Sequence, residues 1–452
     1  MQDFKAIAPR AAAALQEWYA ADPYARKTGL YSYQDPSANV SWKDWSDLSR
    51  IRDNMTNGVM TLSGRRYATQ AMAHWWNSAN ALTALIGYMA ATGDRSYVQP
   101  AVENTFTRAA KAYRPINTQL SVTRPFDLNL ASYPGFINAF YDDEGWWALA
   151  WLSAYDLTGD EKYLASAKDI FTDMALAWDE TWGGGIYWGK HAGQPDRSGL
   201  TAVPRGWKGP YKNAIANELF IAVAAALGLR FRDRKPASND HENYARWARR
   251  GWEWFSSPPP QGVALINQNN LVNDSPNNHG VNDNTKGVWS YNQGVILSGL
   301  CDLAELTGDQ GYLERAENIA TAFIANRWQV AKPAGKQAEQ ALPAVQSGVI
   351  DGILHEHNDC RPDGSALPSA GAAPGAGSAQ FKGIFVRNLA RLYLKTQNAS
   401  YAQFIQANAR SAVQNMNAHH QFGGNWAATA DAPDFMRQSA GLDLLTAALV
   451  VA

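Results

Sequence analysis

A short repeated motif constrains the fold of this chain more than any other feature. Thr-Gly-Asp occurs around Gly93, Gly159 and Gly308, each time after an apolar segment and shortly before a Tyr, and a weaker copy lies at residues 396–398. Glycine can adopt the left-handed conformation that closes a helix, and the Asp after it can cap the next one. Each copy therefore predicts an apolar helix, a tight turn and a second helix, which marks an internal repeat.

The two helices of each repeat differ in character. Those before the turns are apolar on nearly all sides and rich in Ala and Gly, which indicates burial on more than one face. Those after the turns carry charge on one face and apolar residues at helical spacing, which is typical of outer helices. We expect inner helices over 74–91, 142–157, 212–231, 291–306, 381–396 and 436–450. We expect outer helices over 3–19, 96–113, 161–177, 242–255, 311–326 and 400–416.

Strict alternation of six buried and six amphipathic helices predicts an all-α fold, the (α/α)6 barrel, as one domain over residues 1–452. An open solenoid of helix pairs is the alternative, but it would have shorter loops. The loops that enter the inner helices are long, over 22–67, 114–140, 182–211, 257–289 and 329–380. Because long loops on a rigid scaffold carry function, we expect the site on the face where the inner helices begin.

Amino-acid composition argues against nucleic acid and membranes as binding partners. The net charge of −1 gives no field that would attract nucleic acid, and no apolar run reaches the length of a membrane span. The eighteen Trp and nineteen Tyr suit a groove that stacks sugar rings, or else a core rich in aromatics. Cys301 and Cys360 allow one bridge at most. The N-terminus has no signal-peptide core, so the protein is intracellular, or extracellular or cell-wall associated if a signal was removed.

The second inner helix is the only one that opens with paired carboxylates, Asp142 and Asp143, followed by Glu144. Adjacent carboxylates can span the roughly 5–5.5 Å of a retaining glycosidase pair. The helix N-terminus favours an ionised carboxylate, which suits a nucleophile, and a neighbouring anion favours a protonated one, which suits an acid. Ordinary helix capping explains the same residues. We interpret Glu144 as a helix-start acid that faces away from any sugar.

Polar and aromatic residues cluster at or near the starts of the inner helices, and they suit hydrogen bonds and stacking to a sugar. The candidate substrate-binding residues are Trp75, Asn77, Asn80, Tyr141, Tyr187, Trp188, Tyr211, Asn213, Tyr291, Asn292, Gln293 and Lys382. For each, a capping or packing role is the alternative. Tyr187 and Trp188 follow three glycines at 183–185, which indicates a tight turn or a short β-hairpin.

Two loop segments resemble metal sites superficially. His355, Glu356, His357, Asp359 and Cys360 lack the zinc spacing on one helix face. The Asn- and Asp-rich run 267–284 lacks the EF-hand spacing. We therefore expect a hydrogen-bonded loop wall of the cleft at the first segment and predict no metal site at either.

Several stretches, taken together, resemble glycoside hydrolase family 76, the endo-α-1,6-mannanases and their fungal cell-wall transglycosidase relatives. The stretches are Tyr-Asp-Asp-Glu-Gly-Trp-Trp at 141–147, Gly-Gly-Ile-Tyr-Trp at 184–188, Tyr-Lys-Asn-Ala-Ile-Ala-Asn-Glu-Leu at 211–219, Tyr-Asn-Gln-Gly at 291–294 and Phe-Lys-Gly-Ile-Phe at 381–385. The resemblance covers about residues 60–450. It implies an (α/α)6 barrel, retaining catalysis with Asp142 as nucleophile and Asp143 as acid/base, and no required metal or cofactor.

The leading hypothesis is hydrolysis of α-1,6-linked mannan or manno-oligosaccharides by double displacement, by a monomer. The alternatives are a transglycosidase of the same fold that acts on cell-wall mannan or GPI glycans, a non-catalytic glycan-binding protein, and another (α/α)6 enzyme such as a glucuronyl hydrolase or an epimerase. An epimerase would need several His residues on this face, and only His74 lies at a helix start.

Overall fold

The computed structural model describes residues 3–19, 29–31, 55–56, 59–62, 65–68, 75–112, 132–133, 135–138, 140–190, 211–232, 240–284, 286–325, 347–356, 377–430 and 433–452. Twelve α-helices lie in these ranges. The inner helices are α3 (Trp75–Thr92), α6 (Tyr141–Thr158), α8 (Ala214–Arg232), α10 (Ser290–Thr307), α12 (Phe381–Thr396) and α14 (Phe435–Val450). The outer helices are α1 (Phe4–Gln16), α4 (Asn104–Ala112), α7 (Glu161–Leu176), α9 (Asp240–Ser256), α11 (Gly311–Ala325) and α13 (Ala399–Asn415).

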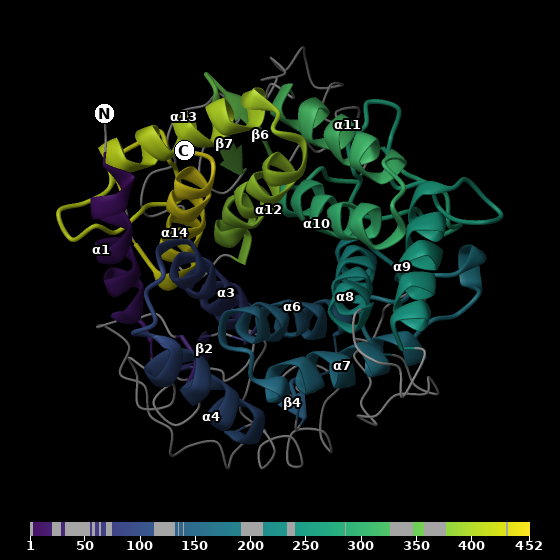
Figure 1. Ribbon diagram of the computed structural model, residues 1–452, viewed down its shortest axis with the longest axis horizontal. Coiled ribbons are helices and arrows are strands. Elements are labelled where there is room, and N and C mark those ends of the chain that lie inside the picture. The colour runs from purple at the N-terminus through teal and green to yellow at the C-terminus, as the bar shows by residue number, and fades with distance from the viewer. Residues whose placement is uncertain are drawn as a thin grey trace.

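The inner helices form a closed ring. Each contacts the next along the chain, and the last, α14, packs against the first, α3. The outer helices surround this ring, as Figure 1 shows. A solenoid leaves its terminal helices apart, so the contact between α14 and α3 excludes it. The prediction of an (α/α)6 barrel is confirmed.

The turns of the repeat form as expected. Gly159 closes α6 at φ 73° and donates to the carbonyl of Tyr155 at 2.7 Å, and Gly308 closes α10 at φ 78°. The carboxylate of Asp160 then caps α7 by accepting the backbone N–H of Lys162. In the weaker copy Gln397 takes the left-handed conformation at φ 56°. Single residues at these turns thus set where each inner helix ends.

One outer helix differs from the prediction. The segment expected as a helix over 96–113 begins with a π-helical stretch, Val98–Glu103, and continues as α4. Pro100 lies inside that stretch and has no backbone N–H to donate, which accounts for the irregular hydrogen bonding.

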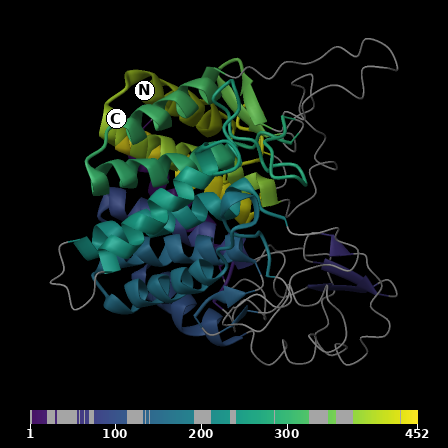
Figure 2. The ribbon, with the colours of Figure 1, turned by 90° about the vertical axis from the view of Figure 1, so that its right-hand side faces the viewer.

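Short antiparallel strands lie on one side of the barrel (Figure 2). They are β1 (Met55–Thr56), β2 (Val59–Leu62) and β3 (Arg65–Ala68) in one sheet, β4 (Ser132–Tyr133) with β5 (Ile137–Asn138), and β6 (Ser347–Ile350) with β7 (Ile353–Glu356). The possible hairpin around 182–188 is instead a 3₁₀ turn, Thr181–Gly183, followed by irregular backbone.

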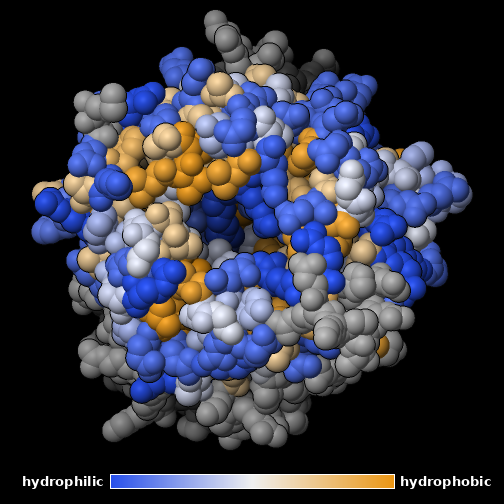
Figure 3. All heavy atoms as spheres, in the orientation of Figure 1, coloured by the Kyte–Doolittle hydropathy of each residue, from blue (hydrophilic) through white to orange (hydrophobic). Residues whose placement is uncertain are grey.

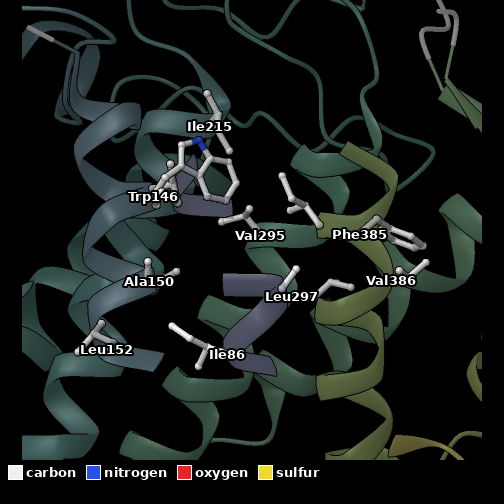
Figure 4. Packing of buried hydrophobic residues seen from close by; sticks show 14 of the residues in the cluster. Ile86, Trp146, Ala150, Leu152, Ile215, Val295, Leu297, Phe385 and Val386 are labelled. Carbon is white, nitrogen blue, oxygen red and sulfur yellow. The ribbon is translucent and has the colours of Figure 1, made fainter. Parts of the chain in front are cut away.

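The apolar core lies among the helices of the ring and between ring and outer layer. Apolar side chains from α3, α6, α8, α10 and α12 pack together at the centre, as Figure 4 shows for residues such as Ile86, Trp146, Ile215 and Val295. The face of the barrel seen in Figure 1 is hollowed at its middle (Figure 3). Cys301 on α10 is a buried free thiol, and Cys360 lies outside the described residues.

Helix α8 is long and apolar enough to cross a membrane by length and composition alone. In this fold 83% of its apolar window is buried inside the protein, as is typical of a core helix. That the protein has no membrane-spanning segment stays a prediction, and so does its organisation as one domain over residues 1–452.

Candidate active site

Asp142 and Asp143 lie in the first turn of α6, on the face of the ring where the inner helices begin. The N-cap of this helix is Phe140, which has no capping side chain. Elsewhere capping is done by side chains at the N-cap position itself, as with Asp160 on α7 and Asp434 on α14. Neither acid occupies the N-cap position, although the Asp142 carboxylate accepts a backbone N–H of the first turn.

Both oxygens of the Asp142 carboxylate accept hydrogen bonds. The indole Nε1–H of Trp188 donates to Oδ2 at 2.8 Å, and the backbone N–H of Asp143 donates to Oδ1 at 3.0 Å. Burial nevertheless raises the pKa of Asp142 to about 6, with these hydrogen bonds opposing the rise and the charge of Asp274 adding to it. Burial thus opposes the effect expected of the helix N-terminus, and a carboxyl group with a pKa of about 6 is still mostly ionised at neutral pH.

A third carboxylate, Asp274, belongs to the site and was missed by the sequence reasoning. It lies in the Asn- and Asp-rich loop, whose backbone hydrogen-bonds the start of α8 through the Ala214 N–H at 2.7 Å. The Tyr211 hydroxyl donates to Asp274 Oδ2 at 3.0 Å, and the Asn292 amide donates to Oδ1 at 3.3 Å. Burial raises the pKa of Asp274 also, against the effect of these two donors. A lone Asp in an irregular loop carries no periodicity that could have revealed it.

Glu218 lies beneath this cluster on α8 and is fully buried. Within the described residues neither of its carboxyl oxygens has a hydrogen-bond partner. Burial, and then the charge of Asp274, hold the pKa of Glu218 well above the usual range, which favours its protonated form. Burial likewise raises the pKa of Tyr291, with Asp274, Asp142 and Glu218 adding to the effect, so its hydroxyl stays protonated.

Aromatic rings form an arc at the same ends of the inner helices. Tyr291 is stacked on Phe381 with ring centres 3.7 Å apart and planes 7° from parallel. Trp76 lies between Phe381 and Trp146, at 6.2 Å from each. Trp76, Tyr291 and Phe381 are only partly buried.

The glycine-rich turn places the two predicted aromatics differently. A side chain at Gly184 or Gly185 would collide with Trp178 or Trp254, and both glycines have positive φ. Tyr187 is held within the loop, with its hydroxyl on Asp179 at 2.7 Å and the Lys212 ammonium 4.8 Å from its ring. Trp188 reaches the site instead, where it contacts Asp142 as described above. The turn thus serves to deliver a hydrogen-bond donor to the carboxylate.

Glu144 does not face solvent as a helix-start acid would. It is fully buried and pairs with Lys190 at 2.9 Å, and Lys190 also pairs with Asp173 of α7 at 2.5 Å. Burial raises the pKa of Glu144 strongly, while the Lys190 charge opposes the rise. Burial alone would lower the pKa of Lys190, but Glu144 and Asp173 together outweigh this effect, so the pKa lies above its ordinary value. This buried triad joins α6, α7 and the end of the glycine-rich loop behind the acidic pair.

Of the other predicted substrate-binding residues, several are anchored within the protein. Trp75 is stacked on Phe136 and lies at a tilt to Trp147. Asn77 bonds Gln380, and Asn80 accepts from Arg387. Tyr141 is buried over Lys190, and Asn213 accepts the Ala216 N–H at the start of α8. Gln293 bonds both backbone groups of Val272, and Lys382 donates to the Gly424 carbonyl above the Trp426 ring. Their contact with a sugar stays a prediction. Tyr211, Asn292 and Tyr291 do lie together with Asp142, and His74 lies outside the described residues.

The first metal-like segment is not a loop wall where it is described, because His355 and Glu356 are the last residues of strand β7. Glu356 accepts from the hydroxyls of Ser290 and Ser347, and burial lowers the pKa of His355 to about 3, so its ring is neutral. His357, Asp359 and Cys360 lie outside the described residues. In the 267–284 loop the Asn273 amide bonds Asn282 and Asn284. No group of three or more potential ligands that could hold a metal occurs among the described residues.

Comparisons with known proteins agree with the fold and the motifs. The sequence profile of Glycosyl hydrolase family 76 matches residues 49–452. A mannan endo-1,6-alpha-mannosidase from Candida glabrata is 30% identical over 199 residues, which is 41% of this chain and 39% of that protein. The chain thus spans about two fifths of the length of this curated relative.

Solved structures extend the likeness to the whole chain. The alpha-1,6-mannanase from Salegentibacter sp. superposes with a TM-score of 0.63 at 19% identity, with 100% of both chains covered. An inactive variant of that enzyme, in which two consecutive aspartates are asparagines, is known in complex with alpha-1,6-mannotriose and superposes with a TM-score of 0.61, again at 19% identity and with full coverage of both chains. At this identity the likeness shows the shared fold.

Proposed function

This chain belongs to glycosyl hydrolase family 76, and from that membership we propose that it hydrolyses α-1,6-linked mannan with retention of configuration. The substrate class is supported by the names of the relatives, which act on 1,6-alpha-mannan. The site supplies what the two-step reaction needs, an adjacent pair of carboxylates at one end of a ring lined with aromatic side chains. That the protein acts as a monomer stays a prediction.

The roles of the pair follow from the hydrogen bonds of Asp142. A general acid must carry a proton on one oxygen, whereas both oxygens of Asp142 accept N–H donors. This arrangement favours the carboxylate form and fixes its orientation, as a nucleophile requires. This observation carries the assignment of Asp142 as nucleophile and leaves Asp143 as acid/base.

In the first step a lone pair of Asp142 forms a bond to the anomeric carbon while the bond to the leaving oxygen breaks, and that oxygen takes a proton from Asp143. In the second step Asp143, now a carboxylate, takes a proton from water as the water oxygen displaces Asp142. The α-linkage is converted to a β-linked glycosyl-enzyme and back to an α-product. Asp274 stays an acceptor, available to sugar hydroxyls, and the aromatic arc offers faces for sugar rings.

Linear α-1,6-mannan tests the function. The intact protein should release a ladder of manno-oligosaccharides, and Asp142→Asn and Asp143→Asn should each remove at least about 10³-fold of the activity, the scale on which single catalytic groups act. Asp169→Asn is a matched control, because this Asp is exposed on the outer helix α7. Full activity of Asp142→Asn would refute the proposal.

Azide rescue separates the two roles. In Asp142→Ala, azide can enter the space left by the nucleophile and attack the anomeric carbon from the same side, giving a β-mannosyl azide. In Asp143→Ala, the glycosyl-enzyme still forms on a substrate with a good leaving group, and azide then gives an α-mannosyl azide. The opposite pairing of variant and product would exchange the two assignments.

A further inference from the structure

A cavity with both apolar and polar side chains in its lining opens on the face of the barrel opposite the acidic pair. It has a volume of about 510 Å³ and is lined by residues from all six inner helices. Its lining includes Ala90 of α3, Leu157 of α6 and Arg230 of α8, which lie near the C-terminal ends of their helices. Figure 3 shows this hollow at the middle of the face, with hydrophilic residues deep inside it.

Arginine dominates the charge of this cavity. Arg95, Arg230, Arg387 and Arg391 line it, against two carboxylates, Asp156 and Asp443. A third, Asp302, pairs with Arg391 from α10. The positive charge therefore exceeds the negative charge around the cavity even when all three carboxylates are ionised.

Helix-end stabilisation explains two of the four arginines. Arg95 donates to the carbonyl of Met89 at 2.9 Å, and Arg230 donates to the carbonyl of Ala226 at 2.7 Å, so both satisfy the last turns of inner helices. Arg387 and Arg391 lie one turn apart in the middle of α12, where no helix end needs them. Both line the cavity from α12.

Ion pairs and hydrogen bonds within the protein use only some of the N–H donors of Arg387 and Arg391. Arg387 uses one amino group on Asp443 at 3.2 Å and the other on Asn80 at 2.6 Å. Arg391 uses one on Ser298 at 2.8 Å and the other on Asp302. A guanidinium carries five N–H donors, so each of these has donors with no acceptor among the described residues. The Thr446 hydroxyl, which also lines the cavity, is buried with no hydrogen-bond partner there.

We propose that this cavity is a binding site for a small phosphorylated sugar, with the phosphate on the guanidinium groups of Arg387 and Arg391 and the hydroxyl of Thr446. Guanidinium groups match the oxygens of a phosphate geometrically, and the free donors supply the hydrogen bonds. The volume lies within the range of small-molecule pockets and exceeds what a free phosphate needs. Ile86, Leu152 and Val295, labelled in Figure 4, give the sugar body an apolar wall.

Calorimetric titration of the full chain at low ionic strength tests this site, with mannose 6-phosphate as the probe. Saturable binding is expected, with competition by inorganic phosphate and none by mannose. Arg391→Gln should weaken binding about tenfold or more, because a hydrogen bond to a charged group contributes about 1.5–3 kcal/mol. Thr446→Val removes one hydroxyl at nearly constant volume and should weaken binding less.

Arg95→Gln keeps the test decisive if Arg391→Gln does not fold, because Arg95 is exposed at the rim of the cavity. Arg249→Gln is the control for unspecific attraction, since Arg249 belongs to a separate arginine-lined pocket on α9. The site is refuted if no saturable binding occurs up to about 10 mM probe, or if the rim and cavity variants bind as the intact chain does. Equal weakening by Arg249→Gln would also refute it. Mannan hydrolysis is measured in parallel, so that a failure of the proposed activity is distinguished from a failure of this site.

Discussion

The indole of Trp188 controls the pH at which Asp142 ionises, and Trp188→Phe tests this. The substitution keeps an aromatic ring next to Phe140, whose ring centre is 4.6 Å away, but removes the N–H that donates to Asp142 at 2.8 Å. A hydrogen bond to a charged group contributes about 1.5–3 kcal/mol, which corresponds to about 1–2 pKa units. The donor favours the carboxylate, so its loss raises a pKa that already lies at about 6.

The assay is the pH dependence of kcat/KM on α-1,6-mannan, which reports ionisations of the free enzyme. The nucleophile must be ionised, so activity falls as the pH drops through the pKa of Asp142. We expect the acid limb near pH 6 in the intact protein and about 1–2 units higher in Trp188→Phe. An acid limb that stays in place while kcat falls would refute the reasoning and would favour a stacking role for Trp188.

A variant that should lower the pKa of Asp142 provides the control. The charge of Asp274 raises the pKa of Asp142, so Asp274→Asn should move the acid limb to lower pH. If Asp274 binds a sugar hydroxyl, the variant should also lower kcat/KM on the pH-independent plateau. The two effects are separable, because the first moves the acid limb along the pH axis and the second lowers kcat/KM at every pH. If both variants move the limb in the same direction, general disturbance of the site is the cause.

Three further predictions concern the buried acids. Asp142→Asn should raise the melting temperature at pH 7 and not at pH 4. The pKa of Asp142 rises from 3.8 in the unfolded chain to about 6 in the folded protein, which destabilises the native protein by about 3 kcal/mol above this pH range. A variant with the same melting temperature as the intact protein at both pH values would contradict this. Glu218→Gln should retain activity, because burial favours the protonated form of Glu218 and Gln resembles that form; a loss as large as that of Asp142→Asn on the same mannan assay would show an ionised role. Lys190→Met should destabilise the protein by about 3–5 kcal/mol, since it leaves Glu144 and Asp173 buried without their cation; thermal unfolding beside Lys5→Met, an exposed control, measures the difference.

The fold was predictable because its determinants are local. A glycine at φ near 75° ends α6 and α10, and an Asp immediately after it begins the next helix. Such signals need no knowledge of distant contacts. The alternation of apolar and amphipathic helices then leaves few arrangements, and closure of the ring by α14 on α3 selects the barrel.

The site was predictable only in part, because its contacts join distant loops. Asp142 is visible from its motif, but its partners Trp188 and Asp274 depend on the course of irregular backbone. Polar residues at helix starts look alike in sequence. Gln293 holds the Val272 backbone while its neighbour Asn292 reaches Asp274, and only the fold distinguishes the two. The Glu144–Lys190–Asp173 triad is hidden for the same reason, since its members come from three separate segments.

Because every inner helix starts on the same face, six positive helix ends lie on the face that carries Asp142 and Asp143. For Asp142 this field is not sufficient: burial still raises its pKa to about 6, and the Trp188 donor is needed to limit the rise. A nucleophile whose pKa lies that close to neutrality is sensitive to one hydrogen bond. Burial is the largest influence on the pKa of Asp142, and the hydrogen bond from Trp188 opposes it, so we expect the pH dependence of the proposed activity to respond to the loop that carries Trp188.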